Sequence, residues 1–290
     1  MKRARSVQAI VVLVLLALVG GYVAGNASGG GSSKVVGSSS PSAVPGSFLA
    51  GIKQRGVLRV GCASAPPTLY QTSSGQWAGP DLLPTKYLAQ LLHVKFECVT
   101  VNWDTIVDGL QAGKYDFAAD LDATPERAMS IRFTDASWTY PGVFVVPANT
   151  KYRTSQALME DTKAPVADVL GSAEDSGISA AMPASRLLRL PDYPPATAAL
   201  LSGRVAADFF DLGDADNAVE AHPNLKIIVP NPPVFVHGVG YGVPADTDAQ
   251  SLQTIDILID NMVAAGQISR AFYAAGYRDV TQLGNLALTP

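Results

Sequence analysis

Hydrophobic and polar residues follow two alternating periods along the chain. Residues 94–101, VKFECVTV, alternate in the manner of a half-buried strand. Residues 82–93, LLPTKYLAQLLH, instead gather leucines and a tyrosine on one broad helical face. Asp81 precedes this segment and is expected to cap the helix rather than to bind a ligand. With further strands expected at 56–63 and 117–121, the succession predicts βαβ units and a parallel sheet.

The stretch 113–135, GKYDFAADLDATPERAMSIRFTD, combines a helix end, a short strand and a new helix start. Thr124 followed by a proline is a favourable start, because Thr caps free N–H groups and Pro suits the first helical position. The corner therefore presents N–H groups, a hydroxyl and the cation of Arg127 together, which a carboxylate needs. The alternative is a surface arginine beside a helix cap, or one paired with Asp120 or Asp122.

The same pattern starts again in the second half of the chain. An extended run at 141–150 leads into a second series of strands and helices, and another at 236–246 leads into C-terminal helices. We therefore expect an α/β fold of two lobes joined by two hinge strands. Lobe 1 is expected at 48–145 and 243–290, and lobe 2 at 146–242. Such folds bind ligands at the carboxyl ends of strands, so the site is expected in the cleft between the lobes.

The N-terminus has the pattern of a targeting segment. Basic residues precede an apolar run and small residues follow it, so residues 1–27 are expected to be a signal peptide or an uncleaved signal anchor. Residues 28–47 are rich in Gly and Ser and are expected to be a flexible tether. Either alternative places the body of the protein outside the cytoplasm, as a secreted, periplasmic or cell-surface protein, held to the membrane if the segment is uncleaved.

Composition narrows the range of functions. Of the 290 residues, 48% are hydrophobic and 16% are charged, which supports a folded core and argues against disorder. The formal net charge is −4, so no nucleic-acid surface is expected. With 3 His and 2 Cys in the chain, neither a metal site nor a cofactor is expected.

The order of several motifs resembles a known family. Residues 51–277 carry in turn GVLRVG, GQWAGPD, VNWDTIVDGLQAGKYD, TPERAMSIRFTD, LLSGRVAADFFD and AAGQISRAFYAAGY. In this order they resemble the extracytoplasmic solute-binding proteins of ABC transporters, specifically the polar amino-acid-binding family, family 3 of the type II periplasmic binding fold. The resemblance implies capture of a small solute by hinge closure, with the membrane subunits of an ABC transporter as partners.

The resemblance also implies roles for residues of the cleft. In the family, the arginine of the T-x-E-R motif clamps the α-carboxylate of the ligand, and its threonine caps the helix and can donate to the ligand. Arg127 and Thr124 match these positions. Asp211 matches an aspartate that holds the ligand ammonium, and Gly171 and Ser172 match a turn at a helix N-terminus that also touches the carboxylate.

Other positions depart from the family pattern. Asp122 stands where the family usually has Ser or Thr, and Asp120 is close by on the same corner. A carboxylate beside Arg127 would repel a ligand carboxylate. Either Asp122 turns away, or the ligand is more cationic than a neutral amino acid, or Arg127 is paired internally and the site is degenerate. Trp103 matches the aromatic wall of the family's pocket, whereas the usual aromatic before the prolines is missing and Tyr70 is expected to replace it.

Cys62 and Cys98 lie in or just after the first two strands, which are neighbours in this family's fold. A disulfide between them is expected in an oxidising compartment. Two buried thiols are the alternative, because the geometry between adjacent strands is demanding.

Three functions are compatible with the sequence. The first is a binding protein without catalytic residues, which captures an amino acid or a related small zwitterionic or cationic solute for an ABC transporter. The second is an enzyme on the same scaffold that resembles cyclohexadienyl dehydratases, with Asp122 or Asp120 as the general acid. The third is a membrane-tethered sensor or accessory protein with a degenerate pocket.

Overall fold

The computed structural model describes residues 43–288. The expected signal peptide or anchor at 1–27 and most of the expected tether lie outside these residues. Within the described part, each helix is too short or too polar to cross a membrane. The first regular element among the described residues is α2, Phe48–Arg55, which the Ser47 side chain caps.

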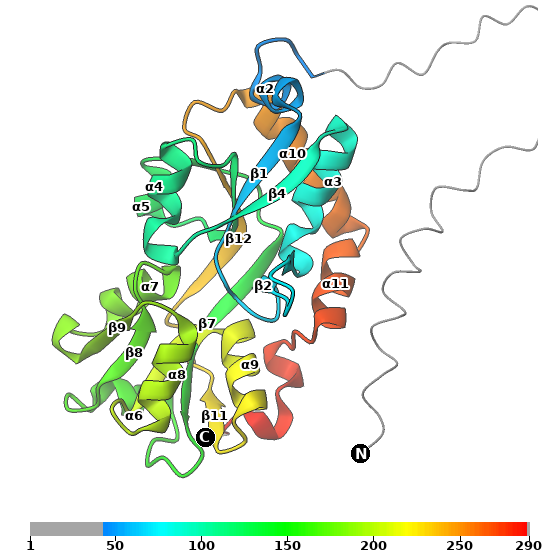
Figure 1. Cartoon of the computed structure of the whole chain (residues 1–290). Coiled ribbons are helices and arrows are strands. Elements are labelled where there is room, and N and C mark those ends of the chain that lie inside the picture. Colours follow the sequence, from blue (N-terminus) through cyan, green and yellow to red (C-terminus); the bar gives the residue numbers. More distant parts are fainter. Residues whose placement is uncertain (1–42, 289–290) are drawn as a thin grey trace, which may run out of the picture. The chain divides into compact units, whose positions relative to one another are not determined.

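The first half of the chain follows the predicted alternation of strand and helix. Its elements are β1 Val57–Cys62, β2 Tyr70–Gln71, β3 Trp77–Ala78, η1 Pro80–Leu82, α3 Leu83–Leu92, β4 Lys95–Thr100, η2 Trp103–Thr105, α4 Ile106–Gln111, β5 Phe117–Asp122, α5 Pro125–Ala128 and β6 Arg132–Phe133. Strands β4, β1 and β5 are parallel neighbours (Figure 1). All six residues of β5 are buried, as expected for a central strand covered on both faces.

The second series of elements builds the other lobe. It comprises α6 Ser155–Glu160, β8 Val166–Val169, α7 Ala173–Ala181, η3 Ala184–Arg186, β9 Leu187–Leu190, α8 Tyr193–Leu201, β10 Ala207–Asp211, α9 Leu212–Ala221 and β11 Leu225–Ile228. Strands β10, β8 and β9 are parallel neighbours, and β10 is buried throughout. Helix α8 begins earlier than the expected residue 196, because Asp192 caps it and prolines occupy its first turn.

Two long strands cross between the lobes, namely β7 Trp138–Pro147 and β12 Val236–Val243. Strand β7 pairs with β12 through residues 138–141 and with β10 through residues 142–145. One continuous hydrogen-bonded sheet therefore runs through both lobes. The change of partner lies before the expected lobe boundary at 145, because the sequence pattern marks the length of the extended run but not the strand beside it.

The C-terminal segment returns to the second lobe. Helices α10 Ala249–Ala264 and α11 Gln267–Ala275 are separated at Gly266, as the sequence predicted. The chain then continues through η4 Val280–Gln282 and η5 Gly284–Leu286 to β11, where Leu288 N–H donates to Ile227 O at 2.8 Å. Arg278 pairs with Asp216 of α9 at 2.7 Å. Residues 243–290 are expected in lobe 1, and this last segment additionally contacts α9 and β11, so it forms a third connection between the lobes.

Apolar packing fixes these elements in place. One large buried cluster includes the central strands, and a smaller one around Phe144 and Phe209 belongs to the second lobe. The crossing strand β7 is tied to α11 by Trp138, whose ring stacks on Phe272 with centroids 4.5 Å apart. Such an aromatic pair adds to the burial of apolar area.

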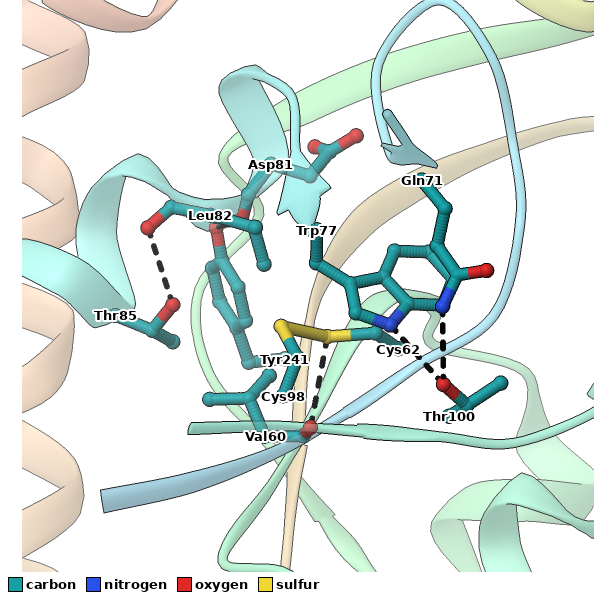
Figure 2. The surroundings of a disulfide bond; sticks show 10 residues. All are labelled: Val60, Cys62, Gln71, Trp77, Asp81, Leu82, Thr85, Cys98, Thr100 and Tyr241. Atoms are coloured by element: carbon teal, nitrogen blue, oxygen red, sulfur yellow. Dashed lines mark hydrogen bonds between the residues drawn. A yellow bond between two sulfur atoms is a disulfide. The ribbon is translucent and has the colours of Figure 1, made fainter. Parts of the chain in front are cut away.

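Cys62 and Cys98 form a disulfide that links β1 to β4 (Figure 2). The register pairs Cys98 with Val60, two residues before Cys62, and the two cysteine Cα atoms are 5.9 Å apart. Beside the bridge, the indole N–H of Trp77 donates to Thr100 Oγ1 at 3.1 Å. The cross-link thus joins the two strands at the end that leads towards the cleft loops.

We predict that the double variant Cys62→Ala, Cys98→Ala loses about 2–4 kcal/mol of unfolding free energy, because the bridge closes a loop of sequence separation 36. Denaturant titration measures this loss, and wild-type protein under reductant should match the variant. Alkylation of both thiols in denatured, unreduced wild-type protein would contradict the bridge.

Candidate functional site

The first lobe contributes the carboxyl end of β5 to the cleft. Between Ala118 and Leu121, two β5 residues face the single β12 residue Tyr241. The extra residue is accommodated at Asp120, whose φ of +54° lies in the left-handed region that residues other than Gly rarely adopt. A bulge of this kind re-aims side chains, and both Asp120 and Asp122 line a cavity between the lobes.

The helix start predicted after this strand is present. Thr124 caps α5, and its Oγ1 accepts from the Arg127 N–H at 3.3 Å. The guanidinium of Arg127 reaches back and across the cleft: Nη1 donates to Asp122 O at 3.1 Å and Nη2 donates to Gly171 O at 2.9 Å. The sequence predicts a carboxylate as the partner of the Arg127 guanidinium. The structure gives it two backbone carbonyls, one from each lobe.

The turn at Gly171 makes a second contact between the lobes. Its φ is +76°, which glycine adopts without strain. A Cβ at this position would lie 2.7 Å from the Cα of Asp104 in the first lobe. The absence of a side chain therefore allows the turn before α7 to touch η2.

The second lobe contributes two helix N-termini. Ser172 caps α7, and its Oγ accepts from the Asp175 N–H at 3.1 Å. Glu174, in the first turn of α7, is buried with 4% of its surface exposed. Asp211 ends β10 and caps α9, accepting from the Asp214 N–H at 2.9 Å. Asp211 is therefore a structural cap that also lines the cavity between the lobes.

These two sides enclose a small cavity with about 10 Å³ of free space, roughly the room that one water needs. Four of its nine lining residues are carboxylic acids, and none of them is Lys, Arg or His. The lining residues are Trp103, Asp120, Asp122, Tyr140, Ser172, Ala173, Glu174, Tyr193 and Asp211. First-lobe and second-lobe carboxyls therefore face the same space.

The structure brings together only some of the residues that the sequence singled out. Those that line the cavity are Trp103, Asp120, Asp122, Ser172 and Asp211. Arg127, Thr124 and Gly171 are not among its lining residues and instead form the contacts described above. Tyr70 lies on the β2–β3 hairpin, has 37% of its surface exposed, and does not line the cavity.

Burial controls the protonation of this cluster. It raises the pKa of Asp122 to about 7, although the Arg127 guanidinium acts in the opposite direction. Burial and then the neighbouring carboxyls hold the pKa values of Asp120 and Glu174 well above their ordinary range. Burial also raises the pKa of Asp211, against the hydrogen bonds of its cap. The cluster therefore favours protonated carboxyls unless a cation joins it.

These shifts determine how the cluster affects stability. Because the folded-state pKa of Asp122 is raised, its contribution is fully present below its ordinary pKa near 3.8 and is lost as pH rises through about 7. A cation that enters the cavity would offset this loss by pairing with the ionised form.

The sequence did not predict that two buried acids, Asp81 and Glu174, lie at or beside the cavity. Asp81 is not a helix cap: it lies in η1, only 2% exposed, and its backbone O accepts from the Tyr241 hydroxyl at 2.6 Å. Burial, with help from Asp211 and Asp122, raises its pKa to about 8. Glu174 has the sequence pattern of an ordinary first-turn acid that complements a helix dipole, so local pattern gave no sign of its place in the cleft.

The acidic cluster is not arranged like a metal centre. Among residues 43–288, no group of three or more His, Cys, Asp or Glu side chains is placed to hold a metal ion.

Comparison with solved structures finds the same fold in amino-acid-binding proteins. The arginine-bound truncated ArgBP from T. maritima is 26% identical, with 73% of this chain and 99% of that chain covered and a TM-score of 0.66. AncCDT-1, described as a precursor of cyclohexadienyl dehydratase, is 25% identical, with 80% and 100% covered and a TM-score of 0.70. A further AncCDT-1 structure, described as an ancestral cationic amino acid solute binding protein, is 26% identical, with 80% and 100% covered and a TM-score of 0.63.

A comparison with curated proteins gave no match. The family profile described as bacterial extracellular solute-binding proteins, family 3, matches residues 58–273, which is most of the described chain. The predicted α/β fold with two lobes is confirmed by this match and by the structural neighbours. The chain therefore belongs to the bacterial extracellular solute-binding proteins of family 3.

Proposed function

We propose that this protein captures a small cationic solute, an amino acid or a related compound, outside the cytoplasm and presents it to an ABC transporter by closure of its two lobes. The observation that carries the proposal is the cavity between the lobes, where four buried carboxyls meet without a basic side chain among the lining residues. Buried carboxyls without a counter-charge are costly, so a cation is the complementary ligand.

One carboxyl in particular requires a donor. Asp122 is 8% exposed and lines the cavity, and its Oδ1 has no hydrogen-bond partner within the described part of the chain. A buried acceptor left unsatisfied costs about 1–3 kcal/mol. An ammonium or guanidinium group of a ligand supplies both the missing donor and the missing charge.

The contacts between the lobes support closure as the means of capture. Arg127 and the turn at Gly171 join the lobes beside the cavity, while Asp122 and Asp211 face it from opposite lobes. A ligand that neutralises carboxyls of both lobes binds the closed form more tightly than the open one. That difference in affinity is what shifts a hinge equilibrium towards closure.

The comparisons agree with a cationic ligand. ArgBP is described as bound to arginine, and AncCDT-1 is described as a cationic amino acid binder. Delivery to an ABC transporter follows from the family resemblance of the sequence motifs.

Two observations support the enzymatic alternative. A pKa near 7 at Asp122 is suitable for a general acid, and a structural neighbour is described as a precursor of a dehydratase. We favour capture because burial among other carboxyls already accounts for this pKa, and because the same carboxyls together form a cation site.

We predict that a thermal-shift screen of amino acids, amines and organic acids identifies a cationic ligand. At about 100 times its dissociation constant, a ligand adds about 2.7 kcal/mol, or roughly 5 °C or more in Tm. Asp211→Asn should abolish the shift, whereas Asp246→Asn, at an exposed aspartate after β12, should not. Stabilisation by organic acids alone would contradict the proposal, and the absence of any hit would favour the degenerate sensor.

Affinity for the cation should rise with pH. Asp122, with a pKa of about 7, must be ionised to pair with it, while Asp211, Glu174 and Arg127 contribute to the same local field. We expect the association constant from calorimetry to increase by roughly tenfold or more between pH 5 and pH 8. Asp122→Asn should flatten this dependence. An affinity that falls as pH rises would contradict it.

Closure can be tested with a matched pair of glycines. Gly171→Ala places a Cβ 2.7 Å from Asp104, whereas Gly203→Ala, at a similar φ of +74°, meets nothing within 4 Å. Both variants carry the same backbone strain, so the difference between them isolates the contact between the lobes. We expect Gly171→Ala to weaken cation binding by about tenfold or more relative to Gly203→Ala. Equal affinities would show that this contact is not part of the binding conformation.

A further inference from the structure

We propose that Glu174 supplies, from within the protein, the carboxylate that the cleft of an amino-acid-binding relative takes from its ligand, and that this chain therefore selects cations without a carboxylate. The chemical class is that of alkyl diamines and amino-guanidines. This inference rests on the proposed function, since it specifies the cation that the same cavity binds.

The N-terminus of α7 already has internal partners for the groups that would receive a carboxylate. The Gly171 N–H donates to Asp175 Oδ2 at 3.1 Å, and the Asp175 N–H donates to Ser172 Oγ at 3.1 Å. The Ser172 N–H donates to Val169 O, also at 3.1 Å. Burial and the carboxyls of Asp122 and Asp211 raise the pKa of Glu174, whereas its own backbone N–H and the Ser172 side chain act in the opposite direction. A helix N-terminus attracts an anion, and here the anion belongs to the helix itself.

The first-lobe half of the expected carboxylate clamp is engaged in the same way. Both terminal nitrogens of Arg127 donate to backbone carbonyls, and the Thr124 hydroxyl accepts from the Arg127 N–H. Glu174 is near enough to favour the charged form of this guanidinium. Two of the five guanidinium donors of Arg127 and the acceptor side of the Thr124 hydroxyl thus have partners within the protein.

Charge in the cavity points the same way. A ligand carboxylate would meet Asp120, Asp122, Glu174 and Asp211, and whichever of them is ionised would repel it strongly in a buried site. Asp122 is 8% exposed, and its Oδ1 has no hydrogen-bond partner within the described part of the chain. This oxygen can accept a hydrogen bond but cannot donate one when the carboxyl is ionised.

Calorimetry with matched pairs of compounds tests the proposal on the full folded protein. Each pair differs by one carboxylate: agmatine and arginine, putrescine and ornithine, cadaverine and lysine. We expect the carboxylate-free member of at least one pair to bind at least tenfold more tightly than its amino acid. Equal or tighter binding of all three amino acids would overturn the inference and leave the proposed function intact. Binding of neither series would instead overturn the proposed function.

Variants at Glu174 test its role directly. Glu174→Ala releases the Ser172 hydroxyl and the α7 N-terminus, and should shift the agmatine-to-arginine affinity ratio at least tenfold towards arginine. Glu174→Gln removes the charge but keeps an acceptor oxygen in place, so it should weaken agmatine binding and recover less arginine binding than Glu174→Ala. Glu97→Ala, on the exposed face of β4, is the control and should change neither affinity. An unchanged ratio in a folded Glu174→Ala variant would overturn the proposal.

Discussion

The burial of several carboxyls between two lobes is the constraint on which the rest of this structure depends. Asp120 and Asp122 come from the first lobe, and Glu174 and Asp211 from the second. Removing them from water raises their pKa values, so the cleft in isolation favours bound protons. In the function we propose, a cation replaces those protons and holds the two lobes together, so that one cluster couples binding, closure and protonation.

The sequence predicted the framework because the framework follows local rules. The periodicity of residues 82–93 and 94–101 gave α3 and β4, and Thr124 before a proline gave the start of α5. The order of motifs gave the family and the cleft. It also revealed the conflict between Arg127 and the neighbouring aspartates. In the structure Arg127 donates to Asp122 O and Gly171 O, and this internal pairing is one reason why we propose a cation as the ligand.

The remaining features depend on contacts distant in sequence. Glu174 reads as an ordinary first-turn acid, and only the approach of the two lobes places it against Asp122. The sequence pattern predicts Asp81 as a helix cap, whereas in the structure its backbone O accepts from the Tyr241 hydroxyl, 160 residues away. The C-terminal segment returns to β11, where the Leu288 N–H donates to Ile227 O, and the local sequence pattern does not predict this contact. Local periodicity specifies elements, whereas these contacts specify the chemistry of the cleft.

The most direct test of the coupling is to count protons during binding. Calorimetric titration with agmatine near pH 7, in buffers of different ionisation enthalpy, gives the number of protons exchanged per cation bound. Since Asp122 has a pKa of about 7 and its neighbours also have raised pKa values, the account predicts a net release of protons to the buffer. Binding with no proton exchange, or with proton uptake, would contradict it.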